Sequence, residues 1–124
     1  MNNKKLGNDF EKLMCQKLAD RGYWAHFLSP DRSGKQPFDI IAASYGNTIV
    51  MDCKTLNDKA KKFPLSRLED NQILAFEKWI ACGNSQPIIA VYWHEQIYWI
   101  PYKILKEYGS IDMEDARIYV WMPK

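Results

Sequence analysis

The stretch FDIIAASYGNTIVMDCK, residues 38–54, contains two apolar runs joined by a turn, and each run carries one aspartate. The runs 38–44 and 48–54 have the composition of β-strands, and the residues 45–47 between them are turn formers. This pattern predicts an antiparallel hairpin. An aspartate in each strand is unexpected, because buried strands rarely carry a charge without a partner.

The register of this hairpin decides where its acidic side chains point. If the chain turns through the four residues 44–47, Asp39 lies directly opposite Asp52, and opposed residues share one face at roughly 5 Å between their β-carbons. Lys54 shares the face of Asp52 because side chains alternate along a strand. A three-residue turn, 45–47, would place Asp39 on the other face, and the aspartates would then form ordinary salt bridges at strand ends.

Two facing carboxylates in a partly buried hairpin need a compensating charge. A magnesium ion would supply it, because Mg²⁺ prefers oxygen ligands and often takes only one or two protein carboxylates. Asp39 and Asp52 are the candidate ligands, and the backbone carbonyl of Cys53 could add a third oxygen. Lys54 would then lie beside the metal site, where it could orient a water or stabilise a developing charge.

The composition places the chain among ordinary globular proteins. Its 124 residues suit one domain, 1–124, and 47% apolar with 26% charged residues argues against a disordered chain. We expect a cytoplasmic protein without a membrane partner, because no apolar run approaches the roughly 20 residues that span a bilayer. Three widely spaced cysteines and two histidines argue against a disulfide framework and a structural zinc site.

Basic residues gather after the hairpin although the net charge is only +2. From position 54 to 67 the one acid is Asp58, and such a cluster could neutralise DNA phosphates. The alternative is a solvated polar loop. The turn-rich segment SPDRSGKQP, 29–37, predicts an exposed loop that carries two more basic residues. The candidate DNA contacts are Lys59, Lys61, Lys62, Arg67, Arg32 and Lys35.

The remaining pattern predicts a mixed α/β fold in which helices flank a central sheet. Ser66 and Glu69 fit a capping box that would begin the second helix. Residues 118–121 are strand-like and could add to the sheet edge of a second copy. The predicted elements are a helix at 4–21, strands at 23–28, 38–44 and 48–54, a helix ending near 83, strands at 87–93 and 96–100, and a short helix at 102–108.

Two further polar residues fall on apolar helix faces. Glu11 lies at the edge of the apolar stripe of the first helix. It could join the metal site, or its carboxylate could reach solvent. Gln72 falls in the middle of the apolar face of the second helix, and a buried amide needs partners. It could bind the backbone of the sheet as a structural feature, or reach the attacked phosphate and its water.

These residues, in this order, resemble the PD-(D/E)XK nuclease superfamily, and within it the RecU-type Holliday junction resolvases. The match covers roughly residues 7–102. Its parts are GNDFE with Glu11, PFD with Asp39, MDCK with Asp52 and Lys54, and FPLSRLEDNQI with Gln72. The last part is the more specific one, because a D-x-K triplet is frequent by chance.

The resemblance implies a restriction-endonuclease-like fold and a metal-dependent DNA endonuclease that acts on branched DNA, in a bacterium or a phage. Asp39 and Asp52 would bind Mg²⁺ or Mn²⁺, Lys54 would assist the attacking water, Glu11 would be the acid of the first helix, and Gln72 would position water or phosphate. A homodimer is expected, because a four-way junction has two strands to cut.

Two departures from the RecU pattern bear on the substrate. The second acid is Asp52 where that family usually has glutamate, and only the short segment LSPDRSGKQPFD stands where the family carries a stalk. A nuclease for flaps, forks or duplex DNA is therefore an alternative to a junction resolvase. A DNA- or protein-binding module that keeps the fold without turnover is a second alternative.

Overall fold

A five-stranded mixed sheet forms the centre of the computed structural model, which describes residues 3–28 and 36–121, with side chains from residue 6 onward. Strands β3 and β5 pair in parallel, and the other neighbours pair antiparallel. The predicted mixed sheet is confirmed. Its order is β1 (Trp24–Phe27), β2 (Ile40–Ser44), β3 (Asn47–Thr55), β5 (Ile88–Trp93) and β6 (Gln96–Pro101).

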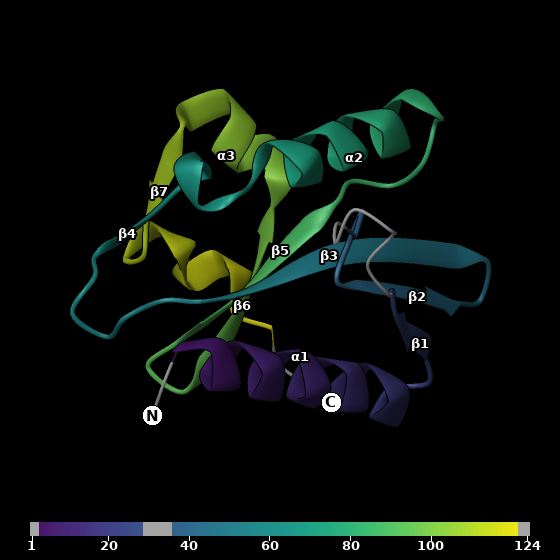
Figure 1. The fold of residues 1–124 in the computed structure, drawn as a ribbon, viewed down its shortest axis with the longest axis horizontal. Coiled ribbons are helices and arrows are strands. Elements are labelled where there is room, and N and C mark those ends of the chain that lie inside the picture. Colours follow the sequence, from purple (N-terminus) through teal and green to yellow (C-terminus); the bar gives the residue numbers. More distant parts are fainter. Residues whose placement is uncertain (1–2, 29–35, 122–124) are drawn as a thin grey trace.

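Helices cover both faces of this sheet (Figure 1). Helix α1 (Asn3–Asp20) lies along one face, and α2 (Asp70–Ala81) with α3 (Tyr102–Tyr108) covers the other. A small second sheet pairs β4 (Lys62–Pro64) with β7 (Ser110–Asp112), and short 3₁₀ turns occupy Leu65–Arg67 and Asp115–Tyr119. Within residues 3–28 and 36–121, no helix is both long and apolar enough to cross a membrane.

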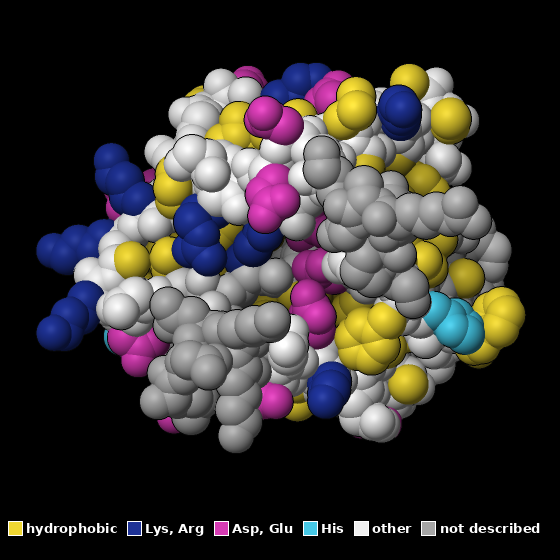
Figure 2. Space-filling view, viewed as in Figure 1, with side chains coloured by type: hydrophobic (Ala, Val, Ile, Leu, Met, Phe, Trp, Pro, Cys, Tyr) yellow, Lys and Arg dark blue, Asp and Glu magenta, His cyan; other side chains and the backbone are white. Residues whose placement is uncertain are grey.

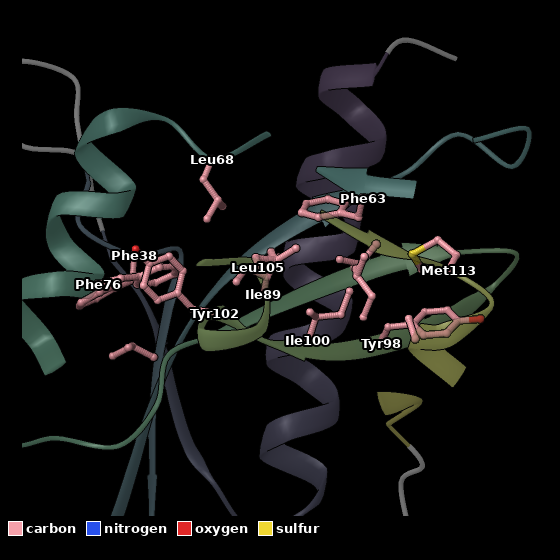
Figure 3. Packing of buried hydrophobic residues seen from close by; sticks show 14 residues of the cluster. Phe38, Phe63, Leu68, Phe76, Ile89, Tyr98, Ile100, Tyr102, Leu105 and Met113 are labelled. Atoms are coloured by element: carbon pink, nitrogen blue, oxygen red, sulfur yellow. The ribbon is translucent and has the colours of Figure 1, made fainter. Parts of the chain in front are cut away.

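Each face of the sheet has its own apolar core because side chains alternate along the strands. Ile40 and Ala42 pack with Phe10, Met14 and Leu18 of α1, which recur at the spacing of one helix face. The other core lies under α2 and α3, and Figure 3 shows its aromatic part. The rings of Phe38 and Phe76 stack there at 5.7 Å between centroids.

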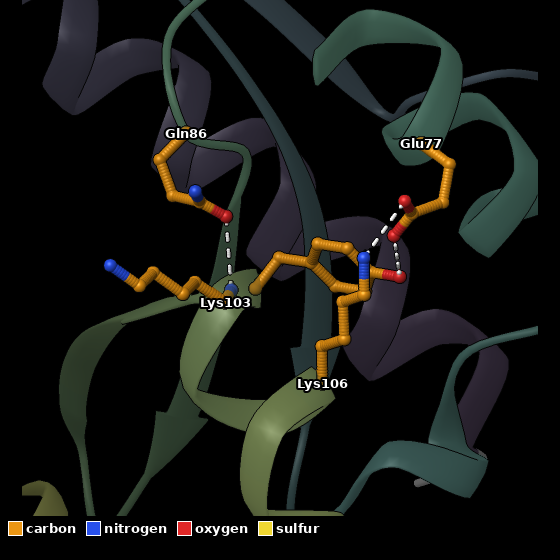
Figure 4. Close-up of polar contacts among 5 residues, drawn as sticks. Glu77, Gln86, Lys103 and Lys106 are labelled. Atoms are coloured by element: carbon orange, nitrogen blue, oxygen red, sulfur yellow. Dashed lines mark hydrogen bonds and ion pairs between the residues drawn. The ribbon is translucent and has the colours of Figure 1, made fainter. Parts of the chain in front are cut away.

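A polar link joins α2 to α3 on this second face (Figure 4). The Tyr102 hydroxyl donates to Glu77 Oε2 at 2.6 Å, and the Lys106 ammonium donates to Glu77 Oε1 at 3.0 Å. The Gln86 side chain accepts from the backbone N–H of Lys103 at 2.9 Å, which anchors the first turn of α3. The far end of α2 is thereby fixed over the sheet.

The β2–β3 hairpin has the register that places the two aspartates opposite each other. Ala43 pairs with Thr48 and Ser44 with Asn47, so the predicted register is confirmed and the three-residue alternative is excluded. The unpaired turn is shorter than expected and consists of Tyr45 and Gly46, both at positive φ (50° and 78°). Such a two-residue turn matches the twist of the flanking strands.

The predicted start of the second helix is wrong by one turn. Glu69, not Ser66, is the N-cap of α2: its side chain accepts from the backbone N–H of Gln72, and Gln72 Oε1 accepts from the Glu69 N–H at 2.9 Å. Ser66 lies in the preceding 3₁₀ turn. A glutamate can cap a helix when its longer side chain folds back, which the sequence pattern for serine does not include.

The predicted strand at 118–121 is also wrong. Residues Asp115–Tyr119 form a 3₁₀ turn, and Val120 makes only an isolated bridge to Tyr98. Trp121 donates its backbone N–H to the Ile97 carbonyl at 2.8 Å, and its ring stacks on Trp99 at 4.8 Å. The tail therefore lies on the β6 edge of its own sheet, which does not support its addition to the sheet of a second copy.

Candidate active site

The two aspartates meet where β2 begins and β3 ends. Asp39 is 6% exposed and Asp52 is 0% exposed. The Cys53 backbone N–H donates to Asp39 Oδ2 at 2.7 Å, and the Asp39 backbone N–H donates to Asp52 Oδ1 at 3.2 Å. Each carboxylate is thus held by the backbone of the other strand, which fixes the pair in position.

One oxygen of this pair has no partner in the part of the chain that is described. Asp52 Oδ2 is buried and makes no hydrogen bond. Burial and the nearby charge of Asp39 raise the pKa of Asp52 to about 7, although the Lys54 ammonium opposes the shift. A buried carboxylate with too few hydrogen-bond donors would be stabilised by a positive charge beside it.

Glu11 joins the aspartates from α1. Burial, the charge of Asp39 and a hydrogen bond with it raise the pKa of Glu11 to about 7. Glu11 and Asp39 also line the same open pocket of about 300 Å³. The structure therefore brings the acid of the first helix to the aspartate pair, as the sequence pattern suggested.

Lys54 and Gln72 meet on the other side of the pair. The Lys54 ammonium donates to Gln72 Oε1 at 3.2 Å, and the same oxygen accepts the Glu69 backbone N–H. Gln72 is 8% exposed. Its structural contact is with the first turn of α2 and not, as one alternative had it, with the sheet backbone, and the same oxygen holds the Lys54 ammonium. Contact of Gln72 with a phosphate or its water stays a prediction.

Gln36 is a site residue that the sequence analysis did not single out. Its Nε2 donates to Asp39 Oδ1, and its backbone carbonyl accepts from Asn71 Nδ2 of α2 at 3.4 Å. Pro37 follows it, and a residue before proline is restricted to extended conformations. The signal was an amide three residues before Asp39, which is too common a pattern to predict a contact.

The aspartate pair fits a hard divalent cation. Asp52 Oδ2 is buried and has no partner in the described part of the chain. The Cys53 carbonyl faces Asp39, because the N–H and C=O of a strand residue point the same way. Among the described residues, no three acidic, histidine or cysteine side chains form a metal cage by themselves. Two carboxylates and one carbonyl leave the other positions to water and phosphate, which is how Mg²⁺ is often bound.

Arg67 is held rigidly beside the end of β3. Its guanidinium donates to the Thr55 carbonyl at 2.8 Å and lies over the Phe63 ring at 5.4 Å from the centroid. The remaining N–H groups of a guanidinium in a fixed position can bind phosphate with little loss of entropy. Arg67 is exposed, so a DNA backbone could reach it.

The basic loop after β3 exposes its lysines and is anchored at its base. Lys59, Lys61 and Lys62 are all exposed. Trp93 Nε1 donates to the Asn57 carbonyl at 3.2 Å. Figure 2 shows lysine and arginine side chains at the margin where Figure 1 places this loop, on the same face as a stripe of acidic side chains.

His94 adds to this anchor from the turn between β5 and β6. Its backbone N–H donates to Asp58 Oδ1 at 3.2 Å, and its ring Nε2 lies 2.9 Å from the Asp58 carbonyl oxygen. His94 has a φ of 49°, a conformation that histidine adopts at some cost. The contacts with Asp58 give a reason for a histidine there.

Comparison with known proteins finds similarity among solved structures. No protein-family model and no curated protein match the sequence. A solved structure of Hjc from Archaeoglobus fulgidus, a Holliday junction resolvase from an archaeal hyperthermophile, is similar with a TM-score of 0.69 and 16% sequence identity. The similarity covers 92% of this chain and 93% of that chain. At this identity it shows the fold, and the predicted restriction-endonuclease-like α/β class is confirmed.

Proposed function

We propose that this protein is a metal-dependent endodeoxyribonuclease that hydrolyses phosphodiester bonds in branched DNA, with all 124 residues forming one catalytic domain. The observation that carries the proposal is the buried Oδ2 of Asp52, which has no partner within residues 3–28 and 36–121 and lies beside Asp39 and the Lys54 ammonium. The similarity in fold to a Holliday junction resolvase supports it. The RecU-type motif supports the finer assignment to junction cleavage.

Asp39, Asp52 and the Cys53 carbonyl would hold Mg²⁺ or Mn²⁺. The cation would neutralise the carboxylates and the phosphate, and it would lower the pKa of the attacking water. Gln36 and the Cys53 backbone N–H hold the Asp39 carboxylate in its orientation. These contacts preorganise the ligands before DNA binds.

Lys54 would stabilise the negative charge that develops on the phosphate in the transition state. Gln72 fixes the ammonium by accepting one of its hydrogen bonds. Glu11 would hold a water beside Asp39 from the α1 side. The exposed Arg67, Lys59, Lys61 and Lys62 would bind the DNA backbone away from the cut, and Arg32 and Lys35 are proposed to do the same from outside the described residues.

The experiment compares wild-type protein and Asp52→Asn on a four-way junction, a flap, a fork and a plain duplex, with Mg²⁺, Mn²⁺ or EDTA. We expect cleavage of branched DNA by the wild type with either metal, none with EDTA, and a loss of about a thousandfold or more in the variant. Equal cleavage by both proteins would refute the assignment of the site. Preference for flaps or forks would support the alternative substrates.

A binding module without turnover predicts a different result. Such a protein would bind DNA without metal-dependent cutting, and Lys54→Ala would leave its affinity almost unchanged. The raised pKa of two acids at one site favours the enzyme, because simple DNA-binding surfaces gain nothing from buried carboxylates.

Cutting two strands of a junction would require two copies of the site, and we propose a homodimer in the bacterial or phage-infected cytoplasm. An apolar hollow of about 540 Å³ beside α2, with the exposed Leu74 in its wall, supports a protein contact there. Leu74→Glu should then give a monomer by light scattering, whereas an unchanged mass would place the contact elsewhere.

A further inference from the structure

The pocket beside Glu11 and Asp39 has walls of two different kinds. The acids form one side, while Phe27 and Leu28 at the end of β1 form an apolar side. Asn8, Lys12 and Gln36 complete the lining. At about 300 Å³ it is at the lower end of the range for small-molecule sites.

Phe27 is unusual in this wall because its ring is 48% exposed although its strand partner Ile40 is fully buried. A single exposed aromatic side chain is common on protein surfaces and means little by itself. Here the ring lines the same pocket as Glu11 and Asp39, so a substrate held by the acids would meet it.

We propose that this pocket binds an unpaired nucleobase of the nucleotide next to the scissile phosphate, with the base stacked on Phe27. A base offers a flat apolar face to an aromatic ring, and such stacking tolerates any sequence. The exposed Lys12 ammonium would meet the phosphate of the same nucleotide, and the amides of Asn8 and Gln36 can bind the base edge. This inference rests on the proposed function and specifies its substrate class.

The pocket selects branched or frayed DNA over continuous duplex. A base inside a duplex is stacked on both faces and paired along its edge, so it has no free face for Phe27. Bases at a flap, a fork or the centre of a junction are unstacked at little cost. A substrate in which the base beside the cut is free would gain the stacking energy, whereas a duplex would first have to open.

The test is a binding cycle with Asp52→Asn protein, which holds DNA without cutting it. The probes are fluorescent fork oligonucleotides with either a normal nucleotide or an abasic analogue at each unpaired position next to the branch. Phe27→Ala in this background should weaken binding of the normal fork about 5- to 150-fold. An abasic analogue at one position should cause the same loss in the Phe27 protein and no further loss in Phe27→Ala.

Two variants separate stacking from a general structural role. Phe27→Trp keeps an aromatic face and should retain the affinity, and Trp24→Ala removes an exposed ring (74% exposed) from the same strand but outside the pocket, so it should leave the affinity unchanged. 2-Aminopurine at the sensitive position should lose fluorescence on binding Phe27 protein and not on binding Phe27→Ala. The proposal would be overturned if Phe27→Ala and the abasic nucleotide each lowered the affinity independently of the other. Equal quenching of 2-aminopurine by both proteins would overturn it as well.

Failure of this inference is distinguishable from failure of the proposed function. The binding cycle needs no cleavage, so it gives a result even if the wild-type protein cuts nothing. Conversely, metal-dependent cleavage of forks with no effect of Phe27→Ala on binding or on single-turnover rate would support the nuclease and refute the base pocket.

Discussion

Glu77 on α2 and Asp52 on β3 are two carboxylates with opposite surroundings. Glu77 accepts hydrogen bonds from Tyr102 and Lys106, and these donors lower its pKa. Asp52 is fully buried beside another acid, one of its oxygens has no partner among the described residues, and its pKa is raised to about 7. The first carboxylate stabilises the fold, while the second destabilises it unless a cation is bound.

The difference shows how α2 serves both structure and chemistry. Its later part is tied to α3 through Glu77, and its first turn presents Gln72 to Lys54. A helix that is fixed by contacts elsewhere can hold a group of unfavourably close acids in place, because the surrounding contacts determine its geometry. A buried acid with a raised pKa beside a second acid is therefore a place to look for function.

The largest expected effect is on the cleavage rate, and it distinguishes the ammonium group of Lys54 from that of Lys106. Lys54→Met should lower the single-turnover rate of DNA cleavage by about 100- to 1000-fold, because it removes the charge that is proposed to stabilise the transition state. Lys106→Met, at the Glu77 link, should leave the rate unchanged. Equal effects of the two substitutions would contradict the assignment of the site.

The second contrast is in stability without metal. Asp52→Asn should raise the free energy of unfolding by about 1 to 3 kcal/mol, because it removes a buried charge beside Asp39 and supplies a donor. Glu77→Gln should lower it by about 1 kcal/mol, because a charged acceptor is lost from two hydrogen bonds. Urea unfolding in EDTA measures both, and a destabilised Asp52→Asn protein would show that its carboxylate is already satisfied.

The third contrast is in pH dependence. The raised pKa values of Glu11 and Asp52 mean that the native state binds more protons than the unfolded state between about pH 4 and pH 7, so these acids lower stability as pH rises through that window. The lowered pKa of Glu77 has the opposite effect on stability. The stabilisation that Glu77 contributes is lost as the pH falls below the usual pKa of a glutamate.

Bound Mg²⁺ should reverse the fall in stability with rising pH that Glu11 and Asp52 cause. Mg²⁺ competes with protons, so its affinity should rise up to about tenfold per pH unit and level off above about pH 7. The melting temperature should therefore increase more with Mg²⁺ at pH 8 than at pH 6. An increase that is the same at both values, or that survives in Asp52→Asn, would contradict this linkage.

The smallest expected effect concerns the anchor of the basic loop. His94→Asn keeps a residue that tolerates positive φ but loses the ring contact with Asp58, so DNA affinity should fall about two- to fivefold. The slope of affinity against salt should stay the same, because the three lysines remain. A changed slope would mean that His94 itself contacts phosphate.

The predictable parts of the fold follow from local pattern. Composition and turn residues predicted the hairpin, but they left two registers open, and the strand pairing of the structure decides for the one in which Asp39 faces Asp52. Glu11 and Gln72 could be singled out because a polar residue on an apolar helix face is rare enough to carry information, while their roles stay predictions. The sequence motif, more than any spacing, led to the fold class that the resolvase structure confirms.

Other parts depend on tertiary contacts that no local pattern encodes. The tail was predicted as a strand, but stacking of Trp121 on Trp99 and the bond to Ile97 hold it against β6. Gln36 joins the site because its side-chain amide donates to Asp39, a single contact that no local sequence pattern predicts. The cap of α2 is Glu69 because Ser66 lies in the 3₁₀ turn before the helix and Leu68 is extended between the two.

Calorimetric titration of Mn²⁺ into the metal-free protein at pH 8 tests the central claim, that Asp39 and Asp52 hold a divalent cation between them. We predict a saturable heat in the wild type that disappears in both Asp39→Asn and Asp52→Asn, while Glu77→Gln binds as the wild type does. Saturable binding that survives in Asp52→Asn, or no binding to the wild type even with branched DNA present, would contradict it.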